Sequence, residues 1–175
     1  MNKIDFLETL RQRTAVVAVG PSALRGQGAG VLGATQKALK TIDLLNISRD
    51  NETAFNHWLD EQTNVVLTAL PIENKPWGAA RKSVNLFLRD LLYNRYLCEM
   101  YKMQEIGHWL EIPLDSAVAR GLKRIAGHGK LPAWPGLKNL RKDISAKFQD
   151  FADVLAKEKE MARVHLDIYL WLENR

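Results

Sequence analysis

Residues 76–120 read PWGAARKSVNLFLRDLLYNRYLCEMYKMQEIGHWLEIPLDSAVAR, and the rest of the chain is organised around this segment. Pro76 and Gly78 indicate a tight turn that opens a long helix, with Lys82 in the first turn of that helix. Asp115 is expected to cap the next helix, because its carboxylate can accept hydrogen bonds from the amides that follow it. The segment therefore predicts a lysine and an aspartate at two helix starts, held by the apolar helix between them.

Helical periodicity continues over the rest of the chain. Apolar residues recur at three- and four-residue steps, which predicts further helices over about 6–19, 31–45, 53–70 and from 137 or 143 to the end. Asn51 or Thr53 can cap the third of these, and residues 16–19 alone could instead form a strand. A glycine-rich loop at 26–30 lacks the Gly-Lys-Ser/Thr of a phosphate-binding loop, so it is read as a connection between helices. We expect an all-α fold.

Length and composition indicate a globular protein with a preference for polyanions. The 175 residues suffice for one compact domain, and 46% apolar with 26% charged residues is ordinary for such a domain. The 25 basic and 20 acidic side chains leave a net charge of +5. A basic chain favours polyanions, of which nucleic acid is the commonest inside a cell.

Several classes of protein are excluded by what the chain lacks. Cys98 is the single cysteine, so a disulfide within the chain, a four-cysteine zinc site and a cysteine-ligated iron–sulfur cluster are impossible. The histidines show no metal-ligand spacing, and no metal or cofactor is expected. No apolar run reaches the roughly 20 residues that span a bilayer, and the N-terminus lacks a signal-peptide core. We expect no membrane association and a cytoplasmic, nucleoid-associated location.

Lys82 and Asp115 could together perform nucleophilic chemistry. The positive end of the helix dipole and burial in a cleft would both lower the pKa of Lys82 towards a neutral amine. Such an amine can attack C1′ of a nucleotide, expel the base and leave a Schiff base. Asp115 could take the lysine proton or stabilise positive charge on the sugar. The simpler alternatives are a solvated lysine and an aspartate that only caps its helix.

The helix that ends before Pro71, the glycine-containing turn and the helix that begins near Ala80 form a helix–hairpin–helix pattern. Such a turn can present backbone amides to one DNA phosphate, although it also occurs as a plain connection. Residues 78–84, GAARKSV, resemble the hairpin of the helix–hairpin–helix (HhH-GPD) DNA glycosylases, typically Gly-Val-Gly-Arg-Lys-Thr-Ala. Residues 112–120, IPLDSAVAR, resemble their Pro-Val-Asp-Thr-His-Val-x-Arg. The resemblance implies that Lys82 forms the Schiff base and that Asp115 is the catalytic carboxylate.

The spacing of the two motifs is similar to that of the archaeal 8-oxoguanine (GO) glycosylase branch, because 115 − 82 gives 33 positions. That branch places a basic residue, an aspartate and a tryptophan at four-residue steps on its last helix. The resemblance implies a base pocket formed by Arg163, Asp167 and Trp171 on the last helix, with Gln27, Trp58 and Leu86 from elsewhere in the chain. Leu86 stands where the branch has a stacking aromatic residue. A surface i,i+4 pair is the alternative for Arg163 and Asp167, and core or interface packing for Trp171.

Contacts with the DNA backbone are expected from the hairpin and from the helix after Asp115. These residues are Trp77, Gly78, Ala80, Arg81, Ser116, Arg120 and Lys123. Ala80 replaces the second hairpin glycine, and Trp77 stands where proline is usual. A basic cluster following Asp115 could extend the phosphate track, with a solvated charged face as the simpler account: Arg120, Lys123, Arg124, Lys130, Lys138, Arg141 and Lys142. Trp134, in a Pro/Gly loop, could wedge into the duplex.

The resemblance implies a single catalytic domain, 1–175, with a two-lobed helix–hairpin–helix DNA glycosylase fold. Lobe A would comprise 1–52 and 131–175, and lobe B 53–130. We expect a bifunctional DNA glycosylase and AP lyase of base excision repair, acting as a monomer on double-stranded DNA with a damaged base, 8-oxoguanine first. The alternatives are a glycosylase for another modified base, a non-catalytic helix–hairpin–helix DNA-binding module, and an all-α interaction protein.

Overall fold

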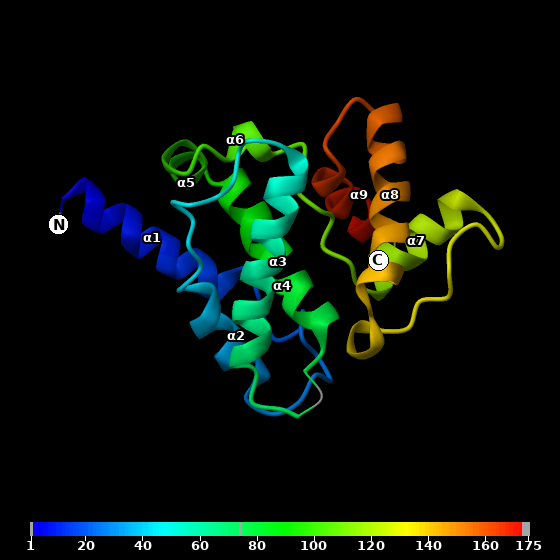
Figure 1. Cartoon of the computed structure of the whole chain (residues 1–175), viewed down its shortest axis with the longest axis horizontal. Helices are drawn as coiled ribbons and strands as arrows, with labels where there is room; N and C mark the ends of the chain where they lie inside the picture. Colours follow the sequence, from blue (N-terminus) through cyan, green and yellow to red (C-terminus); the bar gives the residue numbers. More distant parts are fainter. Residues whose placement is uncertain (1, 74, 173–175) are drawn as a thin grey trace.

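The computed structural model describes residues 2–73 and 75–172, and over these residues it is helical without any β-strand (Figure 1). The α-helices are α1 (Lys3–Val17), α2 (Val31–Leu39), α3 (Glu52–Ala69), α4 (Trp77–Tyr93), α5 (Arg95–Met100), α6 (Met103–Ile106), α7 (Ser116–Ala126), α8 (Lys142–Glu158) and α9 (Leu166–Leu172). Two 3-10 helices, η1 (Leu137–Asn139) and η2 (Arg163–His165), flank α8. The predicted all-α fold is confirmed, and the strand considered at 16–19 is replaced by the end of α1.

Side-chain caps determine where several helices begin. Asn51 accepts a hydrogen bond from the Ala54 amide at 2.9 Å, so the cap considered at Asn51 or Thr53 is Asn51. Asn2 and Asp5 form a reciprocal capping box at the start of α1. Asp115 caps α7, as its position in the sequence predicts. These caps satisfy amides that have no partner within their own helix.

Two hydrophobic cores divide the chain near residue 111. The first lies among α1–α6 and includes Val164 of η2 (Figure 1). The second lies among α7–α9 and includes Ile112, Leu114, Leu131 and Leu140 from the connecting segments. This division differs from the predicted lobes, which joined 1–52 with 131–175. The reason is that α1 and α2 pack against α3 and α4 instead of against the C-terminal helices. Residues 173–175 of the predicted lobe A lie outside the described residues.

Helix α4 is the central element, because nearly every residue from Gly78 to Leu88 is buried. A helix that is buried all round normally carries apolar residues on every face. Here Arg81, Lys82 and Asn85 are buried as well. Buried polar and charged groups are costly unless they are partnered. We therefore expect each of these three side chains to have polar partners on the segments that pack against α4.

Two of the predicted long helices are broken. The helix expected from 137 or 143 to the end stops at Glu158, and Glu160 adopts a left-handed conformation with φ of 53°. After this reversal α9 packs against α7. The helix that begins at Trp77 similarly ends at Tyr93, and Asn94 caps the short α5. No glycine or proline marks either break, so periodicity alone predicted continuous helices.

Within the described part of the chain, no helix combines the length and the apolar character that crossing a bilayer requires.

Candidate active site

Lys82 and Asp115 are in direct contact. The Lys82 ammonium lies 3.1 Å from Oδ2 of Asp115, and it also donates to the carbonyl oxygen of Ala23 at 3.1 Å. Three segments therefore meet at this amine: α4, the start of α7 and the loop between α1 and α2. The Lys82 side chain is only 7% exposed, so the solvated surface lysine is excluded.

Asp115 uses its two carboxylate oxygens for different purposes. Oδ1 accepts hydrogen bonds from the amides of Ala117 and Val118 at 2.9 and 3.0 Å, which caps α7. Oδ2 accepts the hydrogen bond from the Lys82 ammonium. The side chain is 30% exposed, which gives the buried amine a partner that solvent can reach. Capping and pairing with Lys82 therefore coexist in one side chain.

The geometry of the pair corrects two expectations. Because α4 begins at Trp77, Lys82 lies in its second turn instead of its first. The effect of the helix dipole falls off within the first turn, so the helix terminus acts less strongly on Lys82 than expected. The sequence analysis also placed Lys82 in a cleft, whereas its amine is in direct contact with the carboxylate. A substrate would have to separate the pair or approach it from the exposed side of Asp115.

A cavity of about 360 Å³ lies further along α4, between this helix and α9. It is lined by Arg89, Asp90, Tyr93, Asp167, Ile168 and Trp171. Lys82 and Arg89 are seven residues apart, about two helical turns, so they lie on nearly the same face of α4. Leu86, which is buried, lies between them on that face. The cavity and the lysine are thus arranged along one side of one helix.

Asp167 is the buried acid of this cavity. Arg89 is hydrogen bonded to its carboxylate, and Arg89 also pairs with Asp90. Burial raises the pKa of Asp167, and the charge of Arg89 offsets only part of this effect. The charges of Asp115 and Lys82 also act on Asp167, in opposite directions. The cavity and the Lys82–Asp115 pair are therefore electrostatically connected.

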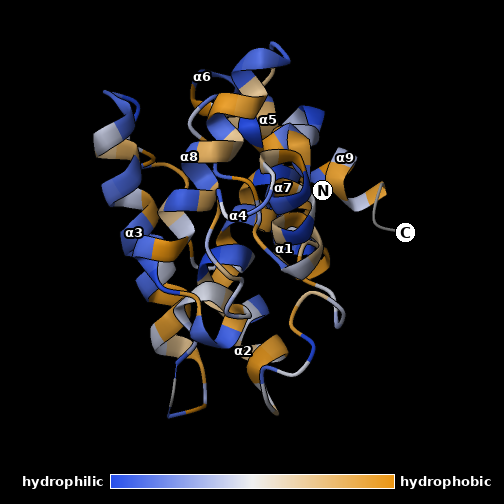
Figure 2. Ribbon diagram, turned by 90° about the vertical axis from the view of Figure 1, so that its right-hand side faces the viewer, coloured by the Kyte–Doolittle hydropathy of each residue, from blue (hydrophilic) through white to orange (hydrophobic). Residues whose placement is uncertain are grey.

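The exposed edge of the cavity is apolar. Trp171 is 47% exposed, and Ile168, Tyr169 and Leu172 beside it on α9 are also exposed. Figure 2 shows apolar colouring along α9 near the C-terminal end. Trp171 is therefore not a core residue, and it lines the cavity together with Asp167. An exposed aromatic beside a polar cavity suits stacking with a planar ligand.

Gln27 is buried in the loop that also supplies Ala23 to Lys82. Its Oε1 atom has no hydrogen-bond partner among the described residues. A buried acceptor without a partner costs about 1–3 kcal/mol, so its persistence suits a group that binds a ligand. Gly26 and Gly28 stand on either side of Gln27, and their φ values of 77° and 117° strongly favour glycine. Gln27 thus remains a candidate for ligand binding, although it does not line the cavity between α4 and α9.

Two predicted pocket residues are elsewhere. Trp58 is buried in the first core, where its ring stacks on Phe55 and its indole N–H donates to the Asp43 carbonyl at 3.2 Å. Arg163 belongs to η2 instead of sharing a helix with Asp167, and it donates to the carbonyls of Leu110 and Trp109. Both are corrections to the sequence prediction. Arg163 and Asp167 have different partners, because Arg163 donates to the carbonyls of Leu110 and Trp109 whereas Asp167 binds Arg89. The indole of Trp58 is already satisfied within the core.

The predicted phosphate contact at the hairpin is also corrected. Gly78 is buried against the η1 segment, where a Cβ would lie 2.6 Å from the Leu137 carbonyl oxygen. Ala80 is buried, and Arg81 is engaged in internal ion pairs. Trp77 is half-buried, with its ring 5.6 Å from the Arg81 guanidinium. Leu137 and Leu140, which follow α7, cover the hairpin at Gly78, and this argues against a phosphate contact at that glycine.

The residues after Asp115 are better placed for a polyanion. Ser116 and Arg120 are exposed on α7, and Lys123 is half-buried. In the wider cluster, Arg141 pairs with Asp143 and Lys142 pairs with Asp60. Trp134 packs edge-on against Phe148 with ring centroids 5.7 Å apart, so it belongs to the second core. That packing does not favour a role for Trp134 as a wedge.

The sequence analysis missed Arg89 and Tyr93 as cavity residues and Glu111 as the partner of Arg81. A signal for Arg89 was present, because its seven-residue separation from Lys82 places both on one helical face. Tyr93 follows on the same face, and its hydroxyl lies 2.8 Å from Nδ1 of His165. Glu111 had no local signal, since its partner is 30 residues away.

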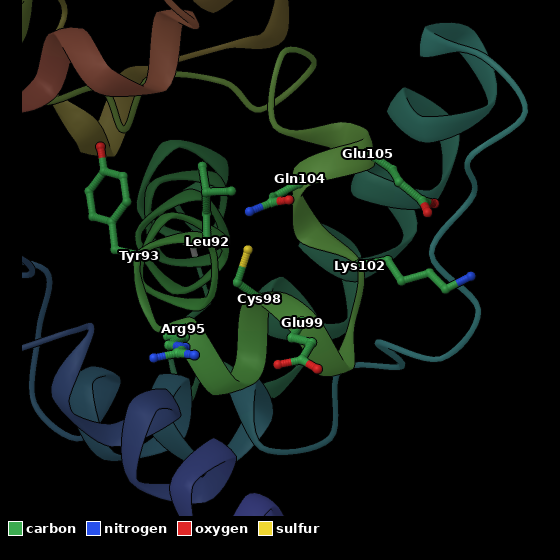
Figure 3. Close-up of a pocket in the computed structure, with 8 residues that line it drawn as sticks. All are labelled: Leu92, Tyr93, Arg95, Cys98, Glu99, Lys102, Gln104 and Glu105. Carbon is green, nitrogen blue, oxygen red and sulfur yellow. The ribbon is translucent and has the colours of Figure 1, made fainter.

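Another cavity, of about 550 Å³, lies around α5 and α6 (Figure 3). Its charged lining residues are two cations, Arg95 and Lys102, and two anions, Glu99 and Glu105. Burial raises the pKa of the Cys98 thiol, which keeps this group in its unreactive protonated form. The cavity therefore offers neither a net charge for an anionic substrate nor an activated nucleophile. Among the described residues, no group of three His, Cys, Asp or Glu side chains is arranged to hold a metal ion.

No protein-family model matches this chain, and comparisons with curated proteins and with solved structures found no match either.

Proposed function

We propose that this protein is a DNA glycosylase with AP lyase activity, of the helix–hairpin–helix type, that removes a modified purine. The observation that carries the proposal is the 3.1 Å contact between Lys82 and Asp115. The two motifs that resemble the glycosylases lie 33 residues apart, and their key side chains meet. The buried amine beside a partly exposed carboxylate has the arrangement of a nucleophile and its base.

The reaction would begin with a flipped nucleotide, because the target atom is inaccessible in a stacked duplex. Asp115 accepts a proton from Lys82, and the amine then attacks C1′ of the sugar. The bond between C1′ and the base breaks, and the base leaves with the electron pair and takes up a proton. Opening of the sugar ring produces the Schiff base. Loss of a C2′ proton then expels the 3′ phosphate, which cleaves the strand by β-elimination.

The cavity between α4 and α9 is the proposed place for the base. Asp167 and Arg89 offer an acceptor and donors for the base edges, and Trp171 offers a stacking surface. Gln27 adds a polar group from the loop beside Lys82. This set suits a purine with altered polar groups on its ring, and 8-oxoguanine is the first substrate to test. Leu86 in place of a stacking aromatic keeps another modified base as the second candidate.

DNA would approach from α7 in this proposal. The hairpin is covered by the η1 segment, so phosphate binding would fall to the exposed start of α7, where Ser116 and Arg120 lie. Because Asp115 already binds the amides of Ala117 and Val118, this contact would depend on the Ser116 hydroxyl and on the charge of Arg120.

Borohydride trapping tests the proposal. A duplex with one 8-oxoguanine is incubated with the enzyme and borohydride, and the covalent adduct is measured together with DNA binding. Lys82→Gln should abolish the adduct. Asp115→Asn should slow its formation about 100-fold or more, because Asn still caps a helix but cannot take a proton. Lys37→Gln, an exposed lysine on α2, is the matched control and should react like the unaltered protein.

Other results would select a different function. An adduct only with another lesion would support a glycosylase of different specificity. Salt-sensitive binding without an adduct for any modified base would support a non-catalytic DNA-binding module. Absence of both would favour an interaction protein, and the proposed function would be wrong.

A further inference from the structure

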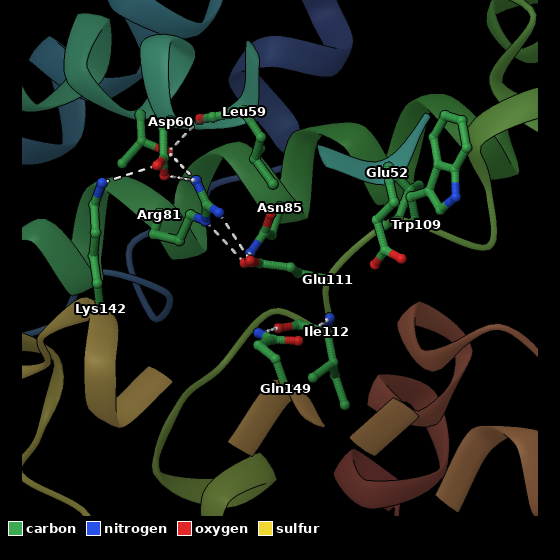
Figure 4. A network of polar contacts seen from close by, with 12 residues as sticks. Glu52, Leu59, Asp60, Arg81, Asn85, Trp109, Glu111, Ile112, Lys142 and Gln149 are labelled. Carbon is green, nitrogen blue, oxygen red and sulfur yellow. Dashed lines mark hydrogen bonds and ion pairs between the residues drawn. The ribbon is translucent and has the colours of Figure 1, made fainter. Parts of the chain in front are cut away.

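A buried polar network occupies the face of α4 next to Lys82 (Figure 4). Arg81 donates two hydrogen bonds of 2.8 Å to the two carboxylate oxygens of Glu111, and Asn85 donates a third at 2.9 Å. Burial alone would raise the pKa of Glu111, but the charge and hydrogen bonds of Arg81 outweigh it and hold this pKa below its usual value. Glu111 is therefore ionised and held to α4 by three hydrogen bonds.

The next residue in the chain is anchored to a different helix. The Ile112 amide donates to the side-chain oxygen of Gln149 at 3.0 Å, and the Gln149 amide group donates to the Ile112 carbonyl at 2.9 Å. Gln149 and Ile112 are both buried (Figure 4). Gln149 is on α8, so it belongs to the second hydrophobic core, whereas Glu111 is held by the first.

These two anchors hold the segment that leads from one core to the other. Asp115 is only three residues beyond Ile112, and Lys82 directly follows Arg81 in α4. The side chain of Arg81 therefore holds one end of the segment, and the side chain of Lys82 contacts Asp115 at the other end. Asp60 adds a further connection, because it pairs with both Arg81 and Lys142 of α8. The relative position of the two cores is thereby tied to the distance between Lys82 and Asp115.

We propose that Glu111 and Gln149 are positioning residues, which hold residues 111–115 so that Asp115 meets Lys82. The proposal rests on the proposed function for its catalytic consequence. Its physical basis is that a buried ion pair contributes little net stability, whereas bidentate bonds fix geometry. A polar network of this kind is thus better suited to defining one arrangement of the two cores than to stabilising them.

Gln149→Met is the principal test, because Met has similar volume but can form neither bond to Ile112. The single-turnover rate of excision should fall about 10- to 100-fold, as small misplacements of reacting groups typically do, while the dissociation constant for DNA stays the same. Gln62→Met, at a buried glutamine of α3 in the first core, is the matched control and should leave the rate within about twofold. A rise in the dissociation constant with an unchanged rate would contradict the proposal.

A second measurement does not depend on catalysis. The modification of Lys82 by an amine-reactive ester, followed by mass spectrometry, should be several-fold faster in Gln149→Met than in Gln62→Met, because a misplaced Asp115 no longer covers the amine. Equal modification rates would overturn the positioning role. If the unaltered protein excises no base yet the modification rates differ, the proposed function fails and the positioning role stands.

A second variant guards against loss of folding. Glu111→Gln keeps the volume and the acceptor atom but removes the charge that binds Arg81. If circular dichroism shows that Gln149→Met is unfolded, Glu111→Gln replaces it as the test of the positioning role. It should show the same pattern of slower excision, unchanged DNA affinity and faster Lys82 modification, and wild-type values in all three would refute the proposal.

Discussion

Asp115 illustrates how one side chain can serve folding and chemistry at the residue scale. Its Oδ1 atom satisfies two amides at the start of α7, and its Oδ2 atom contacts Lys82. The cap holds the carboxylate in place, since rotating it would break two hydrogen bonds. The residue could therefore be predicted from its cap signature, but its second contact depends on α4.

Asp167→Asn should raise the melting temperature at neutral pH by a few degrees, about 2–4 °C for a change near 1 kcal/mol. Burial raises the pKa of Asp167 in the folded protein despite Arg89, so its ionised form is less favourable there than in the unfolded chain. As pH rises from the usual aspartate pKa to this raised value, the unfolded chain ionises first and stability falls. The same substitution should weaken base excision, because it removes an acceptor from the cavity.

Thermal unfolding of both proteins from about pH 3.5 to pH 7 measures this effect. The difference in melting temperature should be smallest at the acid end and largest above the raised pKa. Asp150→Asn, at an exposed position of α8, serves as the control. A difference that stays constant over the pH range would show that ionisation of Asp167 is not its cause.

At the scale of helices, the sequence analysis did not predict the close contact between α4 and η1. The GAARKSV segment predicted a turn open to phosphate, yet Leu137 and Leu140 lie against Gly78. The glycine is needed there for close packing between segments far apart in the chain. A local motif cannot distinguish these two uses of glycine, because both require the absence of a side chain.

Gly78→Ala should destabilise the protein by about 1–3 kcal/mol, the usual cost of overpacking. The added Cβ would lie 2.6 Å from both the Leu137 carbonyl oxygen and Leu140 Cβ, so one of these segments must move. Gly33→Ala on α2 is the matched control, because nothing lies within 4 Å of its Cβ position. That substitution should stabilise the protein by about 0.5–1 kcal/mol. Urea unfolding measures the stability of both variants. Equal midpoints for Gly78→Ala and Gly33→Ala would show that the η1 segment moves to accommodate the added Cβ without loss of stability.

For the whole molecule, the basic residues on α7 follow the partly exposed Asp115 that caps this helix. Arg120 is exposed and Lys123 half-buried on the helix that Asp115 caps. Other members of the cluster are already paired, such as Arg141 with Asp143. The positive surface available to a polyanion is therefore narrower than the sequence suggests, and it lies next to the proposed site.

Replacing Arg120 and Lys123 together by Gln should weaken DNA binding equally for modified and unmodified duplexes. The slope of log affinity against log salt should fall by about 1.8, which corresponds to two lost phosphate contacts. A variant with Lys3→Gln and Lys37→Gln changes the net charge equally, at exposed sites on α1 and α2, and should keep the slope. Fluorescence anisotropy at several salt concentrations tests this, and matching slopes would rule out α7 as the DNA-binding surface.

The sequence alone determined the helical class and the cap at Asp115, and it limited the cap of α3 to Asn51 or Thr53. Each of these depends on residues close together in the chain, where periodicity and hydrogen bonding to neighbouring amides act directly. Only the tertiary structure decided that Gly78 is covered, that Arg163 and Asp167 bind different partners, and that Arg81 binds Glu111. Each of these arrangements is a contact between segments far apart in the sequence. Local sequence patterns do not specify which distant segment packs against a glycine or pairs with a buried charge.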